Sequence, residues 1–131
     1  MKIKQILLLL FVVVFIVGCS NPLEPNQPPN IPCNPIPIDN SLVPGPYIYF
    51  LTWMCSDPDG DSLTYDIYFS NYPDYWYDHY SFGDHPSTYF VPPGRYFIVE
   101  INTMYYWKVV AKDNQGNSTS GPVWCFTTYR D

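Results

Sequence analysis

Three stretches of the chain alternate between apolar side chains and a second, mixed set. They are residues 49–54, 63–69 and 105–112, in which every second residue is aromatic or aliphatic. Successive side chains of a β-strand point to opposite sides, so a period of two predicts strands with one buried face. No stretch after Cys19 shows the 3.6-residue period of an amphipathic helix. The chain is therefore expected to fold as an all-β protein.

Clusters of proline, glycine, aspartate and asparagine separate these stretches. They occupy residues 43–46, 57–61, 91–94 and 113–116, and their residue types are those of tight turns. Short strands joined by such turns are typical of an antiparallel β-sandwich. The 113 residues from 19 to 131 suffice for one small domain.

Four blocks of sequence make this prediction more specific. In chain order they are 51–53 (LTW), 56–69 (SDPDGDSLTYDIYF), 103–113 (TMYYWKVVAKD) and 116–128 (GNSTSGPVWCFTT). Together they resemble a bacterial fibronectin type III domain, over about residues 28–129. The resemblance implies a seven-stranded antiparallel β-sandwich of the fibronectin type III or immunoglobulin-like kind.

The resemblance also implies roles for individual aromatic residues. Trp53 is expected in the core. Tyr105 is expected to lock a corner, with its ring buried and its hydroxyl on nearby backbone. The other implied core residues are Trp107, Val109, Trp124 and Phe126. One departure is residues 71–93, which are long and aromatic where many relatives have a short polar turn.

The first nineteen residues have the layout of a secretory signal peptide. Lys2 and Lys4 give a basic start, residues 6–17 are apolar, and Gly18 precedes Cys19. The apolar run has 12 residues, whereas a membrane-spanning helix needs about 20. A cysteine directly after a small residue at this place resembles the lipobox of bacterial lipoproteins. The resemblance implies cleavage before Cys19 and acylation of its thiol, with palmitate as the type of group added.

These features divide the chain into a signal peptide (1–18), a lipidated cysteine with a proline-rich tether (19–29) and a fibronectin type III-like domain (30–129). Extended proline-rich chain rises about 3 Å per residue, so the tether spans roughly 30 Å. We expect a lipid-anchored protein of the cell membrane or outer membrane, facing the periplasm or the exterior. Ser20 replaces the aspartate that retains Gram-negative lipoproteins at the inner membrane, which favours the outer membrane in such a cell.

The charge of the chain excludes some classes of partner. Once Lys2 and Lys4 leave with the signal peptide, four basic residues face twelve acids, a net charge of −8. Such an acidic protein is not expected to bind nucleic acid or to be held electrostatically on anionic lipid.

An aromatic segment is the candidate binding site. Aromatic rings stack on sugars and anchor protein interfaces, and neighbouring acids bind hydroxyl groups. The alternative is that half of these rings fold back over the sheet as an added hairpin strand. The segment contains Tyr72, Tyr75, Trp76, Tyr77, Tyr80 and Phe82. Outward apolar groups are also expected at Ile48, Phe50 and Met54, which mark either a contact surface or a covered face.

Three cysteines remain beyond Cys19, and export makes a disulfide possible. Cys33 and Cys55 are equidistant from residue 44, which lies in a proline-glycine turn. In an antiparallel hairpin such residues face each other. Cys33–Cys55 is therefore the favoured bridge, with three reduced thiols as the alternative, and Cys125 is expected to point outward.

Asp57, Asp59 and Asp61 could gather around calcium. An EF-hand loop, however, requires glycine at its sixth place and glutamate at its twelfth, where this chain has Ser62 and Tyr68. The alternative is a tight turn whose aspartates bond to their own backbone. No metal or cofactor is predicted.

The chain offers little for catalysis. His79 and His85 lie among aspartates and Ser81, but no nucleophile motif or oxyanion turn accompanies them. We therefore expect a membrane-anchored envelope lipoprotein whose sandwich is a non-catalytic adhesion or ligand-binding domain for a protein or glycan. The alternatives are a carbohydrate-binding module that uses residues 72–82 and a structural spacer or assembly subunit of an envelope complex.

Overall fold

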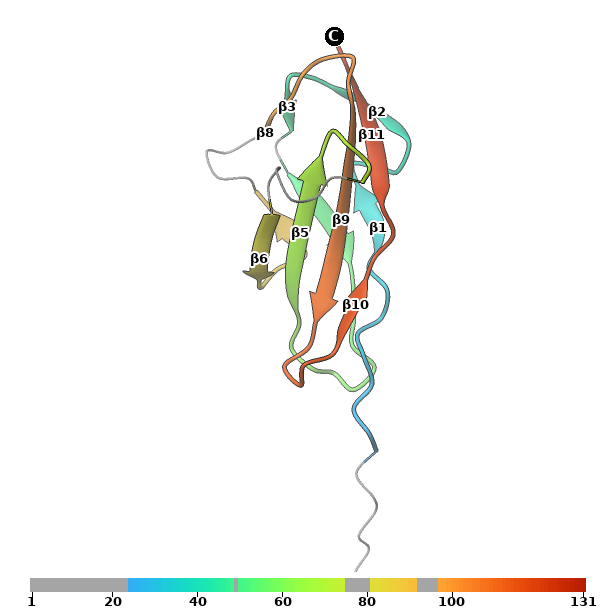
Figure 1. Cartoon of the computed structure of the whole chain (residues 1–131), viewed down its shortest axis with the longest axis vertical. Coiled ribbons are helices and arrows are strands. Elements are labelled where there is room, and N and C mark those ends of the chain that lie inside the picture. Colours follow the sequence, from blue (N-terminus) through green and yellow to red (C-terminus); the bar gives the residue numbers. More distant parts are fainter. Residues whose placement is uncertain (1–23, 49, 75–80, 92–96) are drawn as a thin grey trace, which may run out of the picture.

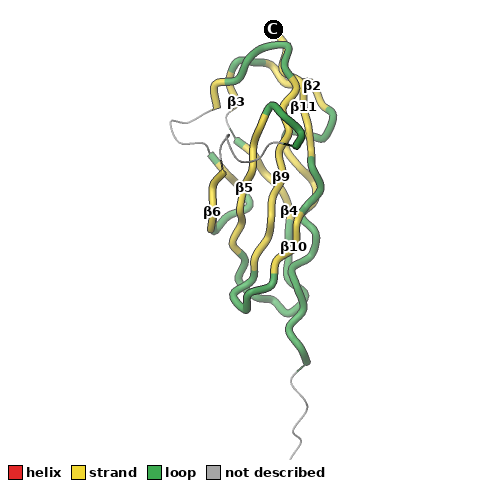
Figure 2. Tube along the Cα trace, viewed as in Figure 1, coloured by secondary structure: helices red, strands yellow, loops and turns green. Residues whose placement is uncertain are grey.

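The computed structural model describes residues 24–48, 50–74, 81–91 and 97–131. Within these ranges the chain forms strands, turns and loops (Figure 2), and none of it is a helix that could cross a membrane. The all-β expectation is therefore confirmed.

The described residues contain eleven strand segments, where the sequence predicts seven longer strands. They are β1 (Cys33–Ile36), β2 (Ser41–Pro44), β3 (Tyr47–Ile48), β4 (Leu51–Met54), β5 (Thr64–Ser70), β6 (Ser81–His85), β7 (Tyr89–Phe90), β8 (Phe97–Ile98), β9 (Met104–Lys112), β10 (Ser118–Ser120) and β11 (Trp124–Tyr129).

The strands form two layers (Figure 1). The larger sheet has the order β2-β11-β9-β5-β6, with β10 beside β9, and the smaller sheet has the order β1-β4-β7. The short strands β3 and β8 pair with each other as a separate two-stranded sheet. The longest ladder joins β5 to β9 over seven residue pairs, from Thr64↔Lys112 to Ser70↔Tyr106.

The core lies between the two layers and is strongly aromatic. Trp53 of β4 meets Trp107 of β9 edge-on, with ring centroids 6.5 Å apart, and Trp107 packs on Trp124 at 4.7 Å. Every inward position of the alternating stretches 63–69 and 105–112 is at least partly buried. The expected core residues Trp53, Trp107, Val109, Trp124 and Phe126 are all buried. Burial of large apolar side chains is the main source of stability in such a domain.

Tyr105 occupies the expected corner. Its ring is buried against Phe69 and Phe126, and its hydroxyl accepts a 2.8 Å hydrogen bond from the backbone N–H of Glu100. Burial raises the pKa of Tyr105, because the phenolate would lose its hydration there. The corner joins the chain before β9 to the core.

The alternation expected around residues 48–54 is interrupted. Ile48, predicted on the outer face, is only 2% exposed, whereas Phe50 and Met54 are exposed as predicted. The prediction for Ile48 is wrong because β3 and β4 are separate segments that pair with different partners, so the pattern restarts between them. One extra residue in such a break exchanges the two faces of a strand.

The sandwich also holds part of the segment that the sequence assigns to the tether. The Asn26 side chain donates to Asp113, and the Gln27 backbone N–H donates to Asp59 at 2.6 Å. Pro29 is buried, and its carbonyl accepts the Thr119 hydroxyl at 2.6 Å. Residues 26–29 are therefore held on the end of the domain.

Candidate binding surface

Several large apolar side chains on the smaller sheet and on the β3-β8 pair are exposed. They are between 39% and 78% exposed. We call this set of side chains the apolar face, and it consists of Ile36, Tyr47, Phe50, Met54, Tyr89 and Ile98. Monomeric proteins rarely leave a contiguous apolar patch of more than a few hundred Å² in water.

Strand pairing groups the residues of the apolar face into two neighbouring sets, one on the smaller sheet and one on the β3-β8 pair. Tyr89 is the cross-strand partner of Thr52, which in turn pairs with Ile36 on the other side of β4. Tyr47 is the partner of Ile98. The Phe50 ring stacks on Tyr89, with centroids 5.7 Å apart and planes 26° from parallel. Side chains that are direct cross-strand partners share one face of a sheet, so each set forms one surface.

A groove of about 390 Å³ borders the apolar face where the chain crosses from the smaller sheet to the larger one. Ile36, Tyr47 and Phe50 line its near side, and Ile38 and Leu42 line its far side. The volume falls within the usual range of ligand pockets, which are mostly apolar.

The groove lies at the end of the sandwich away from the tether. Figure 1 shows β2 and β3, whose residues line the groove, near the C-terminus, while the described N-terminal segment runs along the opposite end. Contacts of Asn26 and Gln27 with the turns at Asp113 and Asp59 fix that opposite end. The groove and the described N-terminal segment therefore lie at opposite ends of the domain.

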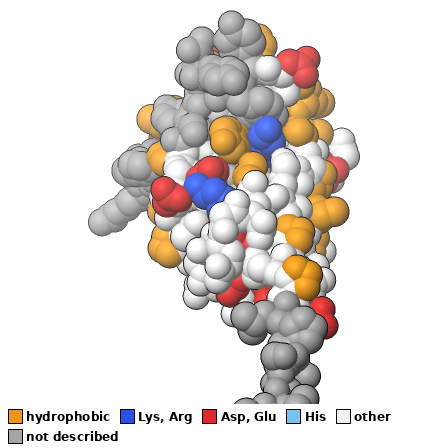
Figure 3. Space-filling model, turned by 60° about the horizontal axis from the view of Figure 1, so that its bottom comes forward, with side chains coloured by type: hydrophobic (Ala, Val, Ile, Leu, Met, Phe, Trp, Pro, Cys, Tyr) orange, Lys and Arg blue, Asp and Glu red, His pale blue; other side chains and the backbone are white. Residues whose placement is uncertain are grey.

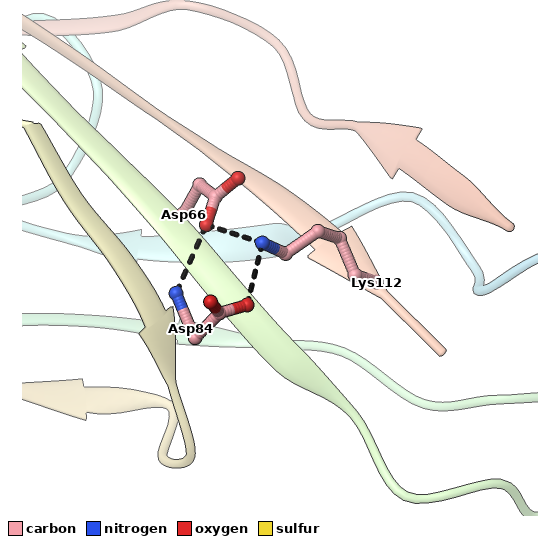
Figure 4. A network of polar contacts seen from close by, with 3 residues as sticks. All are labelled: Asp66, Asp84 and Lys112. Atoms are coloured by element: carbon pink, nitrogen blue, oxygen red, sulfur yellow. Dashed lines mark hydrogen bonds and ion pairs between the residues drawn. The ribbon is translucent and has the colours of Figure 1, made fainter. Parts of the chain in front are cut away.

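Charged side chains gather on the larger sheet instead. Lys112 of β9 donates to Asp66 Oδ1 of β5 at 2.6 Å and to Asp84 Oδ1 of β6 at 2.7 Å (Figure 4). The bonds to Asp66 and then Asp84 raise the pKa of Lys112, because they stabilise its charged form. In Figure 3, acidic and basic side chains lie side by side near the middle of the view, and hydrophobic side chains lie among them and at both margins.

A second acidic group lies in the turns at the tether end. Asp57 Oδ1 accepts the backbone N–H groups of Asp59 and Asp61, as the tight-turn alternative predicts. Asp57 and Asp61 each bury their other carboxylate oxygen with no hydrogen-bond partner among the described residues. Burial, and then repulsion from Asp57, Asp113 and Asp59, raises the pKa of Asp61.

Asp113 in the neighbouring turn behaves in the opposite way. Burial disfavours its charge, but hydrogen bonds from Asn117, Gln115 and Asn26 lower the pKa of Asp113. These bonds tie the turn to the N-terminal segment. Among the described residues, no three His, Cys, Asp or Glu side chains are placed to hold a metal ion.

The predicted aromatic segment is only partly within the described residues. Tyr72 is exposed just after β5. Phe82 belongs to β6 and packs on Phe90 with ring centroids 4.5 Å apart, so its ring covers the core rather than facing a ligand. For Phe82 the hairpin alternative applies, because β6 pairs with β5. The other residues lie outside the described ranges: Tyr75, Trp76, Tyr77 and Tyr80.

The cysteines lie close to their predicted places, but the expected register is wrong by one residue. Cys33 is the cross-strand partner of Met54, not of Cys55. The connection between β1 and β4 is not a simple hairpin, because its middle forms β2 and pairs with β11 of the other sheet. Cys33, Cys55 and Cys125 are all free thiols here, and a Cys33–Cys55 bridge stays a prediction.

The thiols differ in surroundings. Cys33 is exposed. Burial, aided by nearby Cys33, raises the pKa of Cys55 although a backbone hydrogen bond at Ser56 acts against it. Tyr65 lies beside Cys55, and burial, together with Cys55, raises its pKa to about 12. The half-buried Cys125 bonds through Sγ to Asn40 Oδ1 at 3.2 Å.

Of the hypothetical hydrolytic group, the side chains of His85 and Asp84 are described, and they have other partners. His85 Nδ1 lies 3.0 Å from the Ser87 carbonyl oxygen, and Asp84 is engaged with Lys112. His79 and Asp78 are outside the described ranges.

Most of the apolar face was missed by the reasoning from periodicity. β1, β3, β7 and β8 are two to four residues long, too short to show an alternation. A different signal was present in the sequence. Between residues 30 and 56, Asp39 is the only charged residue, and a long uncharged stretch in an acidic protein indicates a surface with a separate use.

Two solved structures share this fold. A Fn3-like protein from Clostridium thermocellum matches with a TM-score of 0.51 at 20% identity, over 80% of this chain and 98% of that one. The fibronectin type III domain of human fibronectin type III domain containing protein 3 matches with a TM-score of 0.50 at 20% identity, over 83% of this chain and 94% of that one. No family model and no curated protein matches the chain. The fold is therefore a fibronectin type III-like β-sandwich, and at this identity the likeness concerns the fold alone.

Proposed function

We propose that this chain is a cell-envelope lipoprotein, anchored through Cys19, whose sandwich is a non-catalytic adhesion or ligand-binding domain. The observation that supports the binding role is the apolar face with its bordering groove. β1, β3, β4, β7 and β8 contain no charged residue, although the protein as a whole is acidic. A pure spacer has no need of exposed isoleucine, leucine and tyrosine side chains on one surface.

The position of the surface agrees with this role. The groove lies at the end of the sandwich opposite to residues 26–29, which hold the N-terminal segment. A domain held at a membrane by its N-terminal lipid would therefore present the groove outward. A protein or glycan partner at the envelope could reach it without meeting the anchor.

The anchor is tested by comparing the full chain with Cys19→Ala. The wild type should take up a fatty-acid label and sediment with membranes, whereas the variant should remain unlabelled and either unprocessed or released. A mature-sized Cys19→Ala protein that still partitions into detergent would contradict the lipoprotein proposal.

The binding role is tested with envelope fragments from producing cells, immobilised on a sensor, and the purified full chain as analyte. We expect saturable binding that Leu42→Asp weakens by at least about tenfold, the effect of about 1.4 kcal/mol. Val123→Asp is the matched control, because Val123 is an exposed apolar residue away from the groove. Equal binding of both variants, or no saturable binding, would favour the spacer role.

The carbohydrate-binding alternative depends on residues 72–82. Of these, Tyr72 is exposed and Phe82 packs on the core. The same sensor experiment with periodate-treated fragments separates the two kinds of ligand, since periodate destroys sugar diols and leaves most protein surfaces unchanged.

A further inference from the structure

We infer that Cys33 and Cys55 form a redox switch that controls whether the N-terminal segment, residues 26–32, is docked on the domain. When both thiols are reduced, a β-bulge in β1 keeps them apart and the segment is docked. When they form a disulfide, the bulge is removed and the segment is released. The switch is a property of the domain and does not depend on the proposed anchor or binding role.

One extra residue in β1 sets the register of the cysteines. Cys33 is paired with Met54. Three residues later, Ile36 is paired with Thr52, which precedes Met54 on β4 by only two residues. Asn34 lies between these pairs with a φ of 52°, and its side chain donates to Met54 Sδ at 3.2 Å. Cys33 and Asn34 therefore both face Met54, and two residues opposite one are a β-bulge.

The bulge prevents a disulfide between the two cysteines. Cys33 is exposed on the same face as its partner Met54, whereas Cys55, the next residue along the chain, packs against the core. The register at Ile36, continued along β1 without an extra residue, brings Cys33 opposite Cys55. Directly opposed residues have Cβ atoms about 4.5–5.5 Å apart, close to the roughly 3.5–4.5 Å of a disulfide. The bridge therefore requires removal of the bulge.

In the reduced form, Cys55 is itself part of the docking site for the N-terminal segment. Its S–H group donates to the Asn30 carbonyl oxygen at 3.2 Å. Asn30 donates in turn to Ser56, from the backbone N–H to the carbonyl oxygen and from the side chain to Oγ, both at 2.9 Å. Pro32, between Asn30 and β1, is fully buried. These contacts hold the segment in the register that the bulge permits.

Formation of the bridge breaks this docking in two ways. A disulfide has no S–H group, so the hydrogen bond from Cys55 to Asn30 is lost. Removal of the bulge also moves Cys33 by one position along β4, about 3.3 Å toward the end where the segment is docked. This movement carries Pro32 and Asn30 out of register with their partners. Each released residue adds about 3 Å of extended chain to the predicted tether.

The oxidising step is a thiol–disulfide exchange with an external disulfide, such as glutathione disulfide. The exposed thiol of Cys33 loses its proton and attacks this disulfide, which releases one thiol and leaves a mixed disulfide on Cys33. Cys55 then loses its proton and attacks the Cys33 sulfur, and the second external thiol leaves. Two protein thiols give up two electrons and become one disulfide, and the external disulfide is reduced to two thiols.

Hydrogen exchange of the purified full chain tests the switch, after equilibration with dithiothreitol or with glutathione disulfide. The backbone N–H of Asn30 reports on docking, because Ser56 accepts its hydrogen bond in the reduced form. In the oxidised sample we expect peptide mapping to find the Cys33–Cys55 bridge and exchange at Asn30 to be at least tenfold faster. Cys55→Ser should abolish the difference between the two samples, and Cys125→Ser should keep it.

Three results of this comparison would overturn the inference. The first is a Cys33–Cys55 bridge that forms while Asn30 stays protected from exchange. The second is a bridge that contains Cys125. The third is the absence of any bridge at every ratio of glutathione disulfide to glutathione.

Variants of Asn34 test whether the bulge controls the thiols. Deletion of Asn34 removes the extra residue and leaves Cys33 opposite Met54, so the bridge should form at least tenfold less and the segment should stay docked under both conditions. Asn34→Val and Asn34→Gly both lose the contact with Met54, but valine disfavours a positive φ and glycine accepts it. The equilibrium constant for bridge formation should be at least tenfold higher for Asn34→Val, about 30 mV for this two-electron couple.

Equal constants for Asn34→Val and Asn34→Gly, or an undiminished bridge in the deletion variant, would show that the bulge does not control the thiols and would overturn the inference. Thermal melts establish that each variant is folded. For a variant that does not fold, the hydrogen-exchange comparison of the unmodified chain decides.

Discussion

The two outer surfaces of this sandwich differ in how their side chains are used. On the larger sheet, Lys112 joins Asp66 to Asp84, and Lys108 lies 5.0 Å from the centroid of the Tyr68 ring. On the smaller sheet, the exposed side chains of Met54, Tyr89 and their neighbours are apolar. On the larger sheet, the charged side chains named above have partners within the chain. On the smaller sheet, the exposed apolar surface offers water few hydrogen-bonding groups. A sheet face of the second kind is the basis of the binding role proposed above.

The largest expected effect concerns the two sides of β4. Trp53 points into the core and its neighbour Met54 points to the apolar face. We expect Trp53→Ala to lower the free energy of unfolding by about 3–5 kcal/mol, because a large cavity is left. Met54→Ala should change it by less than about 0.5 kcal/mol, as exposed positions usually do.

Chemical denaturation of both variants at low protein concentration gives the comparison. Destabilisation by Met54→Ala comparable to that of Trp53→Ala would mean that the apolar face is structural, and the contrast between the two surfaces would disappear.

A smaller effect is expected on the larger sheet. Lys112→Met keeps the aliphatic stem but removes the charge, and we expect a loss of about 1 kcal/mol, the upper range for a partly exposed ion pair. Because the pKa of Lys112 is raised, its contribution is present below its ordinary pKa of 10.5 and is lost as the pH rises through the raised value.

A double-mutant cycle with Asp66→Asn measures this coupling directly. Strictly additive losses in the cycle would show that the network in Figure 4 does not stabilise the sheet.

In the acidic turns, removal of a charge is expected to stabilise the protein, in contrast to Lys112→Met on the larger sheet. Asp61 has a raised pKa in the folded protein, so its ionised form opposes folding. Asp61→Asn should therefore raise the melting temperature at pH 7. Its advantage should shrink as the pH falls through the raised pKa toward the ordinary aspartate value of 3.8, and it should vanish below that value, where the wild-type group is protonated in both states.

Asp131→Asn at the end of the chain controls for the change in net charge. A lower melting temperature for Asp61→Asn at pH 7 would show that the carboxylate is stabilised by a group that the turn does not supply.

The smallest effect is a difference in thiol reactivity. Cys33 is exposed, whereas burial raises the pKa of Cys55, and the thiolate is the reactive form. In the reduced protein at pH 8, iodoacetamide should label Cys33 faster than Cys55. Non-reducing peptide mapping of the exported protein then tests the predicted Cys33–Cys55 bridge, and a bridge to Cys125 would contradict it.

Long strands with regular alternation could be predicted from the sequence, whereas short strands and crossings between sheets could not. Long strands such as β5 and β9 show their alternation over many residues, so their buried faces and Tyr105 were predicted correctly. Ile48 and the register of Cys33 were wrong because β3 is short and the chain crosses between sheets at β2. Pairing between segments far apart in sequence decides such details, and no local pattern records it.

The candidate site shows the same division. Phe50 and Met54 belong to the alternation near β4 and were expected to face outward. Ile36 and Tyr89 join them only through cross-strand pairing, and Ile98 belongs to the separate β3-β8 pair. Periodicity predicts which side chains point outward. Only the strand topology shows which of these side chains are neighbours.

Two methionines allow the central claim to be tested within one protein. Met54 lies on the apolar face and is 60% exposed, whereas Met104 begins β9 on the larger sheet and is 46% exposed. Hydroxyl radicals oxidise exposed methionine to the sulfoxide. The full chain is oxidised in its own envelope and after purification, and both sites are quantified by mass spectrometry. If a partner covers the apolar face in the envelope, oxidation of Met54 should be several-fold lower there than in the purified chain, while that of Met104 stays constant. An unchanged ratio of Met54 to Met104 oxidation in the two preparations would contradict the account.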